Sequence, residues 1–160
     1  MKEDKRKMKI IIMNDEIPKL IRINHDEYAA KYVGQITDGR QFFLTNPFVP
    51  ANKNNEGCEF IALYIFDADG NLLDAKIDNL GPREKVDEEN ARFIQLSRLS
   101  ELGEFLFDDI VVAPFKINKF EVEFGLILHL PEDEEEVLLV TVEPGNYMCF
   151  FSPWDGDYDT

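Results

Sequence analysis

Apolar residues in this chain fall mainly in short runs separated by polar turns, which predicts strands over most of its length. The first clear hairpin is expected where residues 31–36 and 41–46 flank Thr37-Asp38-Gly39-Arg40. Asp-Gly supplies the positive φ angles that a tight hairpin turn requires. Residues 47–57 contain two prolines, three asparagines and a glycine, so an irregular surface loop should follow the hairpin.

A second hairpin is expected next. The run Glu59 to Phe66 is almost wholly apolar, which predicts a strand covered on both faces. Residues 67–71 then form the turn into a strand over residues 72–77. Four more strands should follow, joined by turns so short that neighbours must be antiparallel; they are expected over residues 110–117, 120–130, 137–142 and 147–151.

One segment carries the start and stop signals of a helix. Pro82 suits a first helical turn, Gly103 suits the position after the last turn, and neither residue type occurs between them. The sequence therefore predicts an amphipathic helix over Arg83 to Leu102. We expect it to lie on the sheet with Phe93 and Leu96 buried; insertion into a groove of a partner is the alternative. Its apolar stripe consists of Val86, Phe93, Leu96 and Leu99.

These elements predict one α+β domain over residues 1–160, with a largely antiparallel sheet of about seven to eight strands and one main covering helix. Residues 1–9 contain five basic and two acidic residues and are expected to be a flexible basic tail. The apolar run Ile10 to Met13 is too short for a signal peptide or a membrane span. A cytoplasmic protein without membrane contact is expected.

The net charge of the chain restricts the classes of partner that it can bind. The net formal charge is -15, and residues 10–160 carry 12 basic against 30 acidic groups. Because nucleic-acid binding depends on neutralising phosphates, such a surface argues against direct DNA or RNA binding. A partner protein with a basic surface is the expected counterpart, and the acidic run 132–136 is either a solvated turn or a patch that steers such a partner.

No catalytic site is apparent in the sequence, so a non-enzymatic protein without metal or cofactor is expected. Cys58 and Cys149 lie in apolar runs and should be buried free thiols. His129 is most simply a surface histidine with a hydrogen-bond partner. The carboxylates near Asp67 have part of an EF-hand spacing, but position 6 is Leu72 instead of glycine, which favours a hairpin turn.

The segment Pro153-Trp154-Asp155-Gly156-Asp157-Tyr158-Asp159-Thr160 is the strongest candidate for a binding surface. It combines the only tryptophan with acids at alternate positions. Pro153 and Gly156 suit a chain that turns back onto the domain. The segment should therefore be ordered, and it either binds a partner or covers an open edge of the core. The candidate partner-binding residues are Trp154, Asp155, Asp157, Tyr158 and Asp159.

Together with residues 32–35 (Tyr-Val-Gly-Gln), 38–43 (Asp-Gly-Arg-Gln-Phe-Phe) and 66–71 (Phe-Asp-Ala-Asp-Gly-Asn), this ending resembles bacterial HycA-like formate hydrogenlyase regulatory proteins. The resemblance spans roughly residues 32–160. It implies a protein that antagonises a formate-responsive transcription activator and does not read DNA itself. The resemblance supplies no catalytic residues.

Three functions are therefore open. The first is a non-enzymatic regulatory protein that binds another protein through its acidic patches and aromatic C-terminal segment. The alternative is an immunity-type or nucleic-acid-mimicking inhibitor, whose negative surface would occupy the basic active site of a toxin enzyme. The third is an enzyme with paired carboxylates in a partly buried pocket.

Overall fold

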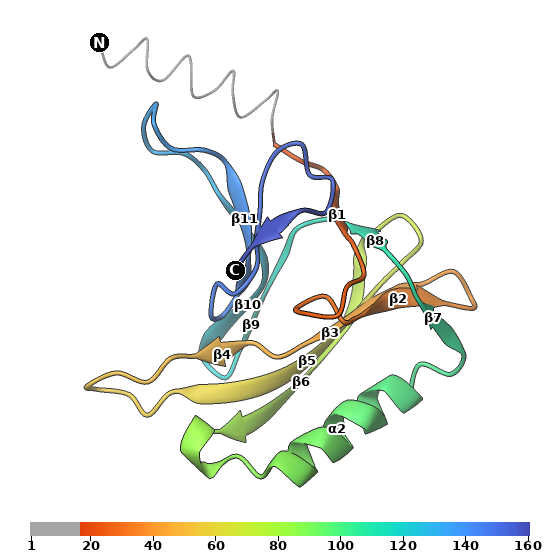
Figure 1. Cartoon of the computed structure of the whole chain (residues 1–160), viewed down its shortest axis with the longest axis vertical. Helices are drawn as coiled ribbons and strands as arrows, with labels where there is room; N and C mark the ends of the chain where they lie inside the picture. Colours follow the sequence, from red (N-terminus) through yellow and green to blue (C-terminus); the bar gives the residue numbers. More distant parts are fainter. Residues whose placement is uncertain (1–16) are drawn as a thin grey trace.

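The structure is a computed structural model that describes residues 17–160. The basic tail expected over residues 1–9 lies outside the described residues. Residues 17–160 form an α+β fold with 13 strands, one α-helix and one short 3-10 helix (Figure 1). The fold class and the mostly antiparallel pairing are as predicted. The expectation of one sheet with seven to eight strands is wrong, because the strands are divided among three sheets.

The largest sheet contains both predicted hairpins. Its strands are β2 (Tyr32–Ile36), β3 (Gln41–Thr45), β4 (Phe48–Val49), β5 (Cys58–Phe66), β6 (Leu72–Gly81) and β7 (Phe105–Phe107). They follow the order β4-β5-β3-β2-β7, and β6 pairs with β5. Strand β6 continues past the predicted end at Ile77 because the ladder with β5 extends to Gly81, across two register shifts.

A second sheet has the order β13-β12-β11-β10-β9. Its strands are β9 (Phe115–Lys119), β10 (Val122–His129), β11 (Leu139–Glu143), β12 (Cys149–Phe150) and β13 (Tyr158–Asp159). The strands β1 (Ile21–Ile23) and β8 (Ile110–Val112) form a separate pair. The predicted strand 110–117 is thus two strands in two sheets, interrupted at Pro114, which has no N–H to donate to a ladder.

Strand β5 lies at the centre of the core. Its residues Phe60, Tyr64 and Phe66 join a cluster with Phe124 and Phe150 from the five-stranded sheet, and its alternate residues join a second cluster under the helix. Edge-to-face contacts connect the two large sheets, with ring centroids 4.9 Å apart for Phe60–Phe124 and 4.7 Å for Tyr64–Phe115. Both faces of β5 are therefore covered, as its apolar run predicts.

The helix begins later than predicted. A 3-10 helix covers Arg83–Lys85, and α2 covers Glu88–Ser100. Asp87 is the N-cap, because its carboxylate accepts hydrogen bonds from the N–H groups of Glu89 and Asn90 at 3.0 and 3.3 Å. This N-cap, with acids in the first turn, is the start signal that the prediction missed.

The helix lies on the sheet as expected, but the predicted burial of Phe93 and Leu96 is wrong. Phe93 is 70% exposed and Leu96 is 50% exposed. The side of α2 that faces the sheet carries Ala91, Ile94 and Leu99, which pack on the cluster formed by the outer faces of β3 and β5. These three residues follow helical spacing, whereas Phe93 and Leu96 lie on the opposite side.

Candidate functional site

The C-terminal segment is folded onto the domain, as predicted. Residues Tyr158 and Asp159 form β13 and pair with β12. The carbonyl of Trp154 accepts a hydrogen bond from the N–H of Arg22 in β1 at 3.2 Å. The side-chain amide of Asn24 donates to the carbonyl of Asp155 at 3.1 Å. The segment 151–160, called the tail below, is therefore attached both to the five-stranded sheet and to the chain after β1.

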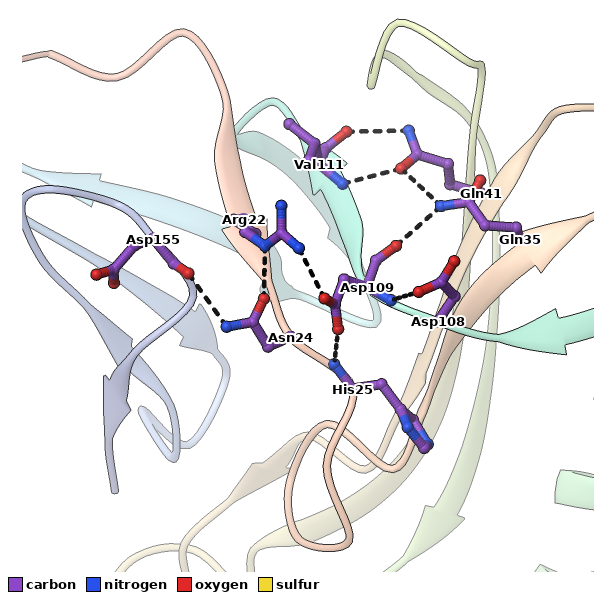
Figure 2. A network of polar contacts seen from close by, with 9 residues as sticks. All are labelled: Arg22, Asn24, His25, Gln35, Gln41, Asp108, Asp109, Val111 and Asp155. Atoms are coloured by element: carbon purple, nitrogen blue, oxygen red, sulfur yellow. Dashed lines mark hydrogen bonds and ion pairs between the residues drawn. The ribbon is translucent and has the colours of Figure 1, made fainter.

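A polar network connects the tail with the two-stranded and six-stranded sheets (Figure 2). Arg22 donates from Nε to Asn24 and from a terminal nitrogen to Asp109, both at 2.7 Å. The carboxylate of Asp109 also accepts the N–H of His25 at 2.7 Å. Gln35 from β2 donates to the backbone carbonyl of Asp109 at 2.9 Å. The N–H of His25 is the main cause that lowers the pKa of Asp109, so its carboxylate remains ionised.

Gly156 allows the close approach of the tail to β1. It is buried and has a φ of +103°, a conformation that glycine adopts readily and other residues do not. A Cβ built at this position would lie 2.3 Å from Nδ2 of Asn24. Only glycine therefore fits here while Asn24 keeps its bonds.

Tyr158 fixes the tail to the loop between β1 and β2. Its hydroxyl donates to Asp26, whose other carboxylate oxygen accepts the N–H groups of Tyr28 and Ala30 at 2.9 and 3.0 Å. Burial opposes ionisation of Asp26, but these hydrogen bonds outweigh it and lower the pKa of the carboxyl. Burial, together with the bond to Asp26, raises the pKa of Tyr158 to about 12. A neutral phenol therefore faces an ionised carboxylate at neutral pH.

The predicted site residues divide into two groups. Asp155, Asp157 and Asp159 are exposed, as a binding surface requires. Trp154 and Tyr158 are half-buried and pack against the main core cluster, so most of their aromatic surface faces inward. The tail thus covers an edge of the core with its rings and presents its carboxylates to solvent. The expectation that the tail covers a core edge is therefore confirmed for its rings, and partner binding by its carboxylates stays a prediction.

The structure adds a second acidic loop to this surface. In the five-stranded sheet His129 pairs with Leu139 and Phe150 pairs with Tyr158. The loop between β10 and β11 and the tail loop between β12 and β13 therefore lie at the same end of the sheet (Figure 1). We call this surface the acidic end; its carboxylates are all exposed and belong to Glu132, Asp133, Glu134, Glu135, Glu136, Asp155 and Asp157.

Sequence reasoning missed Asn24, Asp26 and Tyr28, which border the tail. Two hollows open beside them. The first, of about 430 Å³, lies between Asp26, Tyr28 and the tail residues Asp157 and Tyr158. The second, of about 190 Å³, lies between Tyr28, Tyr32 and Tyr147. The only local signal for this loop is the polar run of residues 24–27, within which an aspartate is typical of an Asx turn.

The other candidate residues take structural positions. Oδ1 of Asp67 accepts the N–H groups of Asp69 and Asn71 at 3.0 and 2.9 Å in the turn between β5 and β6, as the hairpin interpretation predicts. The ring of His129 shares a hydrogen bond of 2.6 Å with Thr141. Both cysteines are unpaired, as predicted. They are half-buried, so the expectation of full burial is wrong; each is the first residue of its strand, where the packing is less complete.

Five carboxylates among residues 17–160 have a clearly displaced pKa, and in each it is lowered, which favours the ionised form: Asp26, Asp38, Asp67, Glu101 and Asp109. Within the same residues, no three or more His, Cys, Asp or Glu side chains gather in a group that could hold a metal ion. No helix in the described part of the chain is long and apolar enough to cross a membrane.

The chain matches no protein-family model, no curated protein and no solved structure.

Proposed function

We propose that this protein is a non-enzymatic regulatory protein that acts by binding another protein, with the acidic end and the adjacent Asp159 as its contact surface. The observation that carries the proposal is the tail itself. Its backbone and rings are fixed to the domain by β13, Asn24 and Asp26, while Asp155, Asp157 and Asp159 are exposed. Carboxylates on a fixed backbone lose little conformational entropy when they bind a basic partner.

The charge distribution supports the same function. The tail loop and the loop 132–136 place their carboxylates at one end of the five-stranded sheet, in a chain whose net charge is -15. Such a surface attracts basic protein surfaces over the Debye length and repels phosphate backbones. The partner should therefore be a basic protein surface, without direct nucleic-acid binding by this chain.

The resemblance to HycA-like formate hydrogenlyase regulatory proteins supports a transcription-regulating role within this function. The last block of that resemblance, residues 153–160, contains the exposed tail carboxylates. Under this proposal the partner is a transcription activator, and the protein prevents its action by occupying a basic surface.

A second candidate rests on the same charges. An immunity-type or nucleic-acid-mimicking inhibitor would use exposed carboxylates to occupy the basic active site of a toxin enzyme. The identity of the partner separates the two functions, because the first requires a transcription regulator and the second requires a nuclease or a related toxin.

The test is affinity capture of the partner with the C-terminus untagged. The variant Asp155→Asn/Asp157→Asn/Asp159→Asn removes the exposed tail charges. Its control, Glu84→Gln/Glu89→Gln/Glu104→Gln, removes the same number of exposed charges elsewhere, at side chains without a hydrogen bond or ion pair within residues 17–160. We expect capture to fall by roughly tenfold or more only in the tail variant. Equal capture by both variants would refute a binding role for the tail.

Deletion of residues 155–160 does not provide the same test. It removes the β13 pairing and the bond to Asp26 together with the carboxylates. Loss of binding in the deletion variant would therefore mix a folding effect with a binding effect. The asparagine substitutions keep the backbone contacts and change the charge alone.

A further inference from the structure

Tyr28 stands between two hollows at the border of the tail. The first hollow, of about 430 Å³, is bordered by Asp26, Tyr28, Asp157 and Tyr158 and is called the tail hollow here. The second, of about 190 Å³, is bordered by Tyr28, Tyr32 and Tyr147 and is called the tyrosine hollow. Tyr28 belongs to both and is 73% exposed. An exposed aromatic ring on a fixed backbone between two depressions is a candidate contact for a partner, because tyrosine is enriched among the residues that dominate binding energy.

The tail hollow has the composition of a cation site. Its charged side chains are Asp26 and Asp157, and no lysine, arginine or histidine borders it. The nearest basic side chain along β1, Arg22, is already paired with Asp109 at 2.7 Å. The rings of Tyr28 and Tyr158 are the aromatic borders, and a cation over a tyrosine face is attracted by the ring quadrupole. Asp157 offers a carboxylate without a hydrogen bond within residues 17–160, whereas Asp26, which already accepts three, adds its negative charge. These charges and the two phenol rings suit a guanidinium or ammonium group.

The tail hollow is also preformed. Asp26 holds the backbone of Tyr28 and Ala30 through two hydrogen bonds and holds the hydroxyl of Tyr158 through a third. Strand pairing of Tyr158 with Phe150 fixes the other wall. A binding group that enters this hollow therefore does not have to order the loop or the tail first.

The tyrosine hollow selects a different kind of side chain. Its volume suits a single side chain, and its borders include Leu44 together with Tyr32 and Tyr147. Lys31 lies at its border, with Nζ 5.6 Å from the centre of the Tyr32 ring. This ammonium group repels a second cation, whereas the rings and Leu44 favour an apolar group.

We propose that the tail hollow binds an arginine or lysine side chain of the partner protein and that the tyrosine hollow binds an apolar side chain close to it in the partner's sequence. Tyr28 separates the two side chains and contacts both. This inference rests on the proposed protein-binding function and specifies its chemistry. The partner should carry a basic residue next to an apolar residue in an exposed segment.

The test uses short peptides as probes with the full-length protein. The probe is Ac-Ser-Arg-Leu-Ser-NH2, and binding is followed by NMR shifts of the backbone amides. One matched peptide replaces arginine with lysine, a second with the uncharged isostere citrulline, and a third replaces leucine with alanine. We expect shifts at Asp26, Tyr28 and Asp157 with the two basic peptides, and about tenfold weaker binding with citrulline.

Two variants of the protein locate the site. Tyr28→Ala removes the shared wall, and Asp157→Asn removes an exposed charge; neither side chain makes a hydrogen bond within residues 17–160. Each substitution should weaken binding of the arginine peptide by about tenfold. Phe93→Ala is the control, since Phe93 is a comparably exposed aromatic residue on α2. The alanine peptide should lose the shifts at Tyr32 and Tyr147 and keep those at Asp157.

The inference is overturned if citrulline binds as well as arginine, if Tyr28→Ala has no effect, or if the shifts appear away from the two hollows. These failures differ from failure of the proposed function. If the peptides do not bind here but Asp155→Asn/Asp157→Asn/Asp159→Asn still abolishes partner capture, the acidic end binds its partner by another mode. If that variant also captures the partner normally, both proposals are wrong.

Discussion

The hydroxyl of Tyr158 donates a hydrogen bond to Asp26, a residue that lies 132 positions earlier in the chain. Asp26 in turn accepts the N–H groups of Tyr28 and Ala30, so one carboxylate connects the tail with the loop before β2. A hydrogen bond to a charged group contributes more to stability than one between neutral groups. This contact should therefore be a main determinant of whether the tail stays on the domain.

Replacement of Tyr158 by phenylalanine removes this bond and leaves the ring in place. We expect Tyr158→Phe to lower the free energy of unfolding at pH 7 by about 1–2 kcal/mol, measured by urea denaturation. Tyr28→Phe is the matched control, since the Tyr28 hydroxyl makes no hydrogen bond within residues 17–160, and it should change nothing measurable. Equal effects of the two substitutions would contradict the proposed importance of the bond.

The same contact predicts that stability depends on pH in the acidic range. The folded-state pKa of Asp26 is lowered, so its contribution is present above its unfolded pKa of about 3.9 and is lost as the pH falls through the folded value. The stability difference between the native protein and Tyr158→Phe should therefore be largest near neutral pH and shrink below about pH 4. A difference that stays constant down to pH 2 would show that the phenol does not act through the ionised carboxylate.

Gly156 and Gly39 allow a matched comparison of tail docking. Both have a positive φ, +103° and +96°, but a Cβ at Gly39 would meet nothing within 4 Å. Gly39→Ala should therefore lower the free energy of unfolding by about 1 kcal/mol, because alanine is strained in this backbone conformation. Gly156→Ala should cost about 2–4 kcal/mol, because Asn24 must also move away from Arg22 and Asp155. Equal losses of stability in thermal unfolding would contradict the tight packing of tail and β1.

Truncation of side chains to alanine should affect stability differently on the two sides of α2. Leu99 is 7% exposed and packs on the sheet, so Leu99→Ala should destabilise the protein by about 2–4 kcal/mol. Phe93→Ala should stay within about 0.5 kcal/mol of the native protein, because its side chain is largely in solvent. Leu96 is half exposed, so Leu96→Ala should cost about 1 kcal/mol of unfolding free energy. A large loss of stability in Phe93→Ala would mean that the helix is turned differently on the sheet.

Local sequence signals predicted local structure well. The Asp-Gly turn places β2 against β3, and the apolar run of β5 is covered on both faces because cores lie on either side of it. The apolar stripe Val86, Phe93, Leu96 and Leu99 does not give the rotation of α2, because Val86 precedes the N-cap at Asp87 and lies outside the helix. A cap sets where a helix begins, and the helical period then decides which residues face the sheet.

The candidate site could be predicted only in part, for a physical reason. The tail carboxylates are visible in the sequence, but Asp26, Tyr28 and Asn24 join them through contacts across more than a hundred residues. The short strands β1 and β7 also depend on partners distant in sequence. Two or three residues have too little periodicity to predict a strand.

Tyr64 provides the last prediction. It is 0% exposed, and its hydroxyl is the one buried side-chain nitrogen or oxygen within residues 17–160 that has no hydrogen-bond partner. An unpartnered buried hydroxyl lowers stability because it has lost water without gaining a replacement bond. Tyr64→Phe should therefore leave the packing of the ring against Phe115 intact and raise the free energy of unfolding by about 1 kcal/mol.

Tyr147→Phe is the matched control for this prediction. The hydroxyl of Tyr147 shares a hydrogen bond of 2.6 Å with Thr45, so its removal should lower stability by about 1 kcal/mol. Burial raises the pKa of Tyr64 in the folded state, so as the pH rises above the unfolded value of about 10 the phenol ionises first in the unfolded chain, which lowers the free energy of unfolding of the native protein. Tyr64→Phe should consequently also unfold less readily at alkaline pH than the native protein. Destabilisation by Tyr64→Phe at pH 7 would mean that the hydroxyl has a bonding partner, such as a buried water shared with Tyr147.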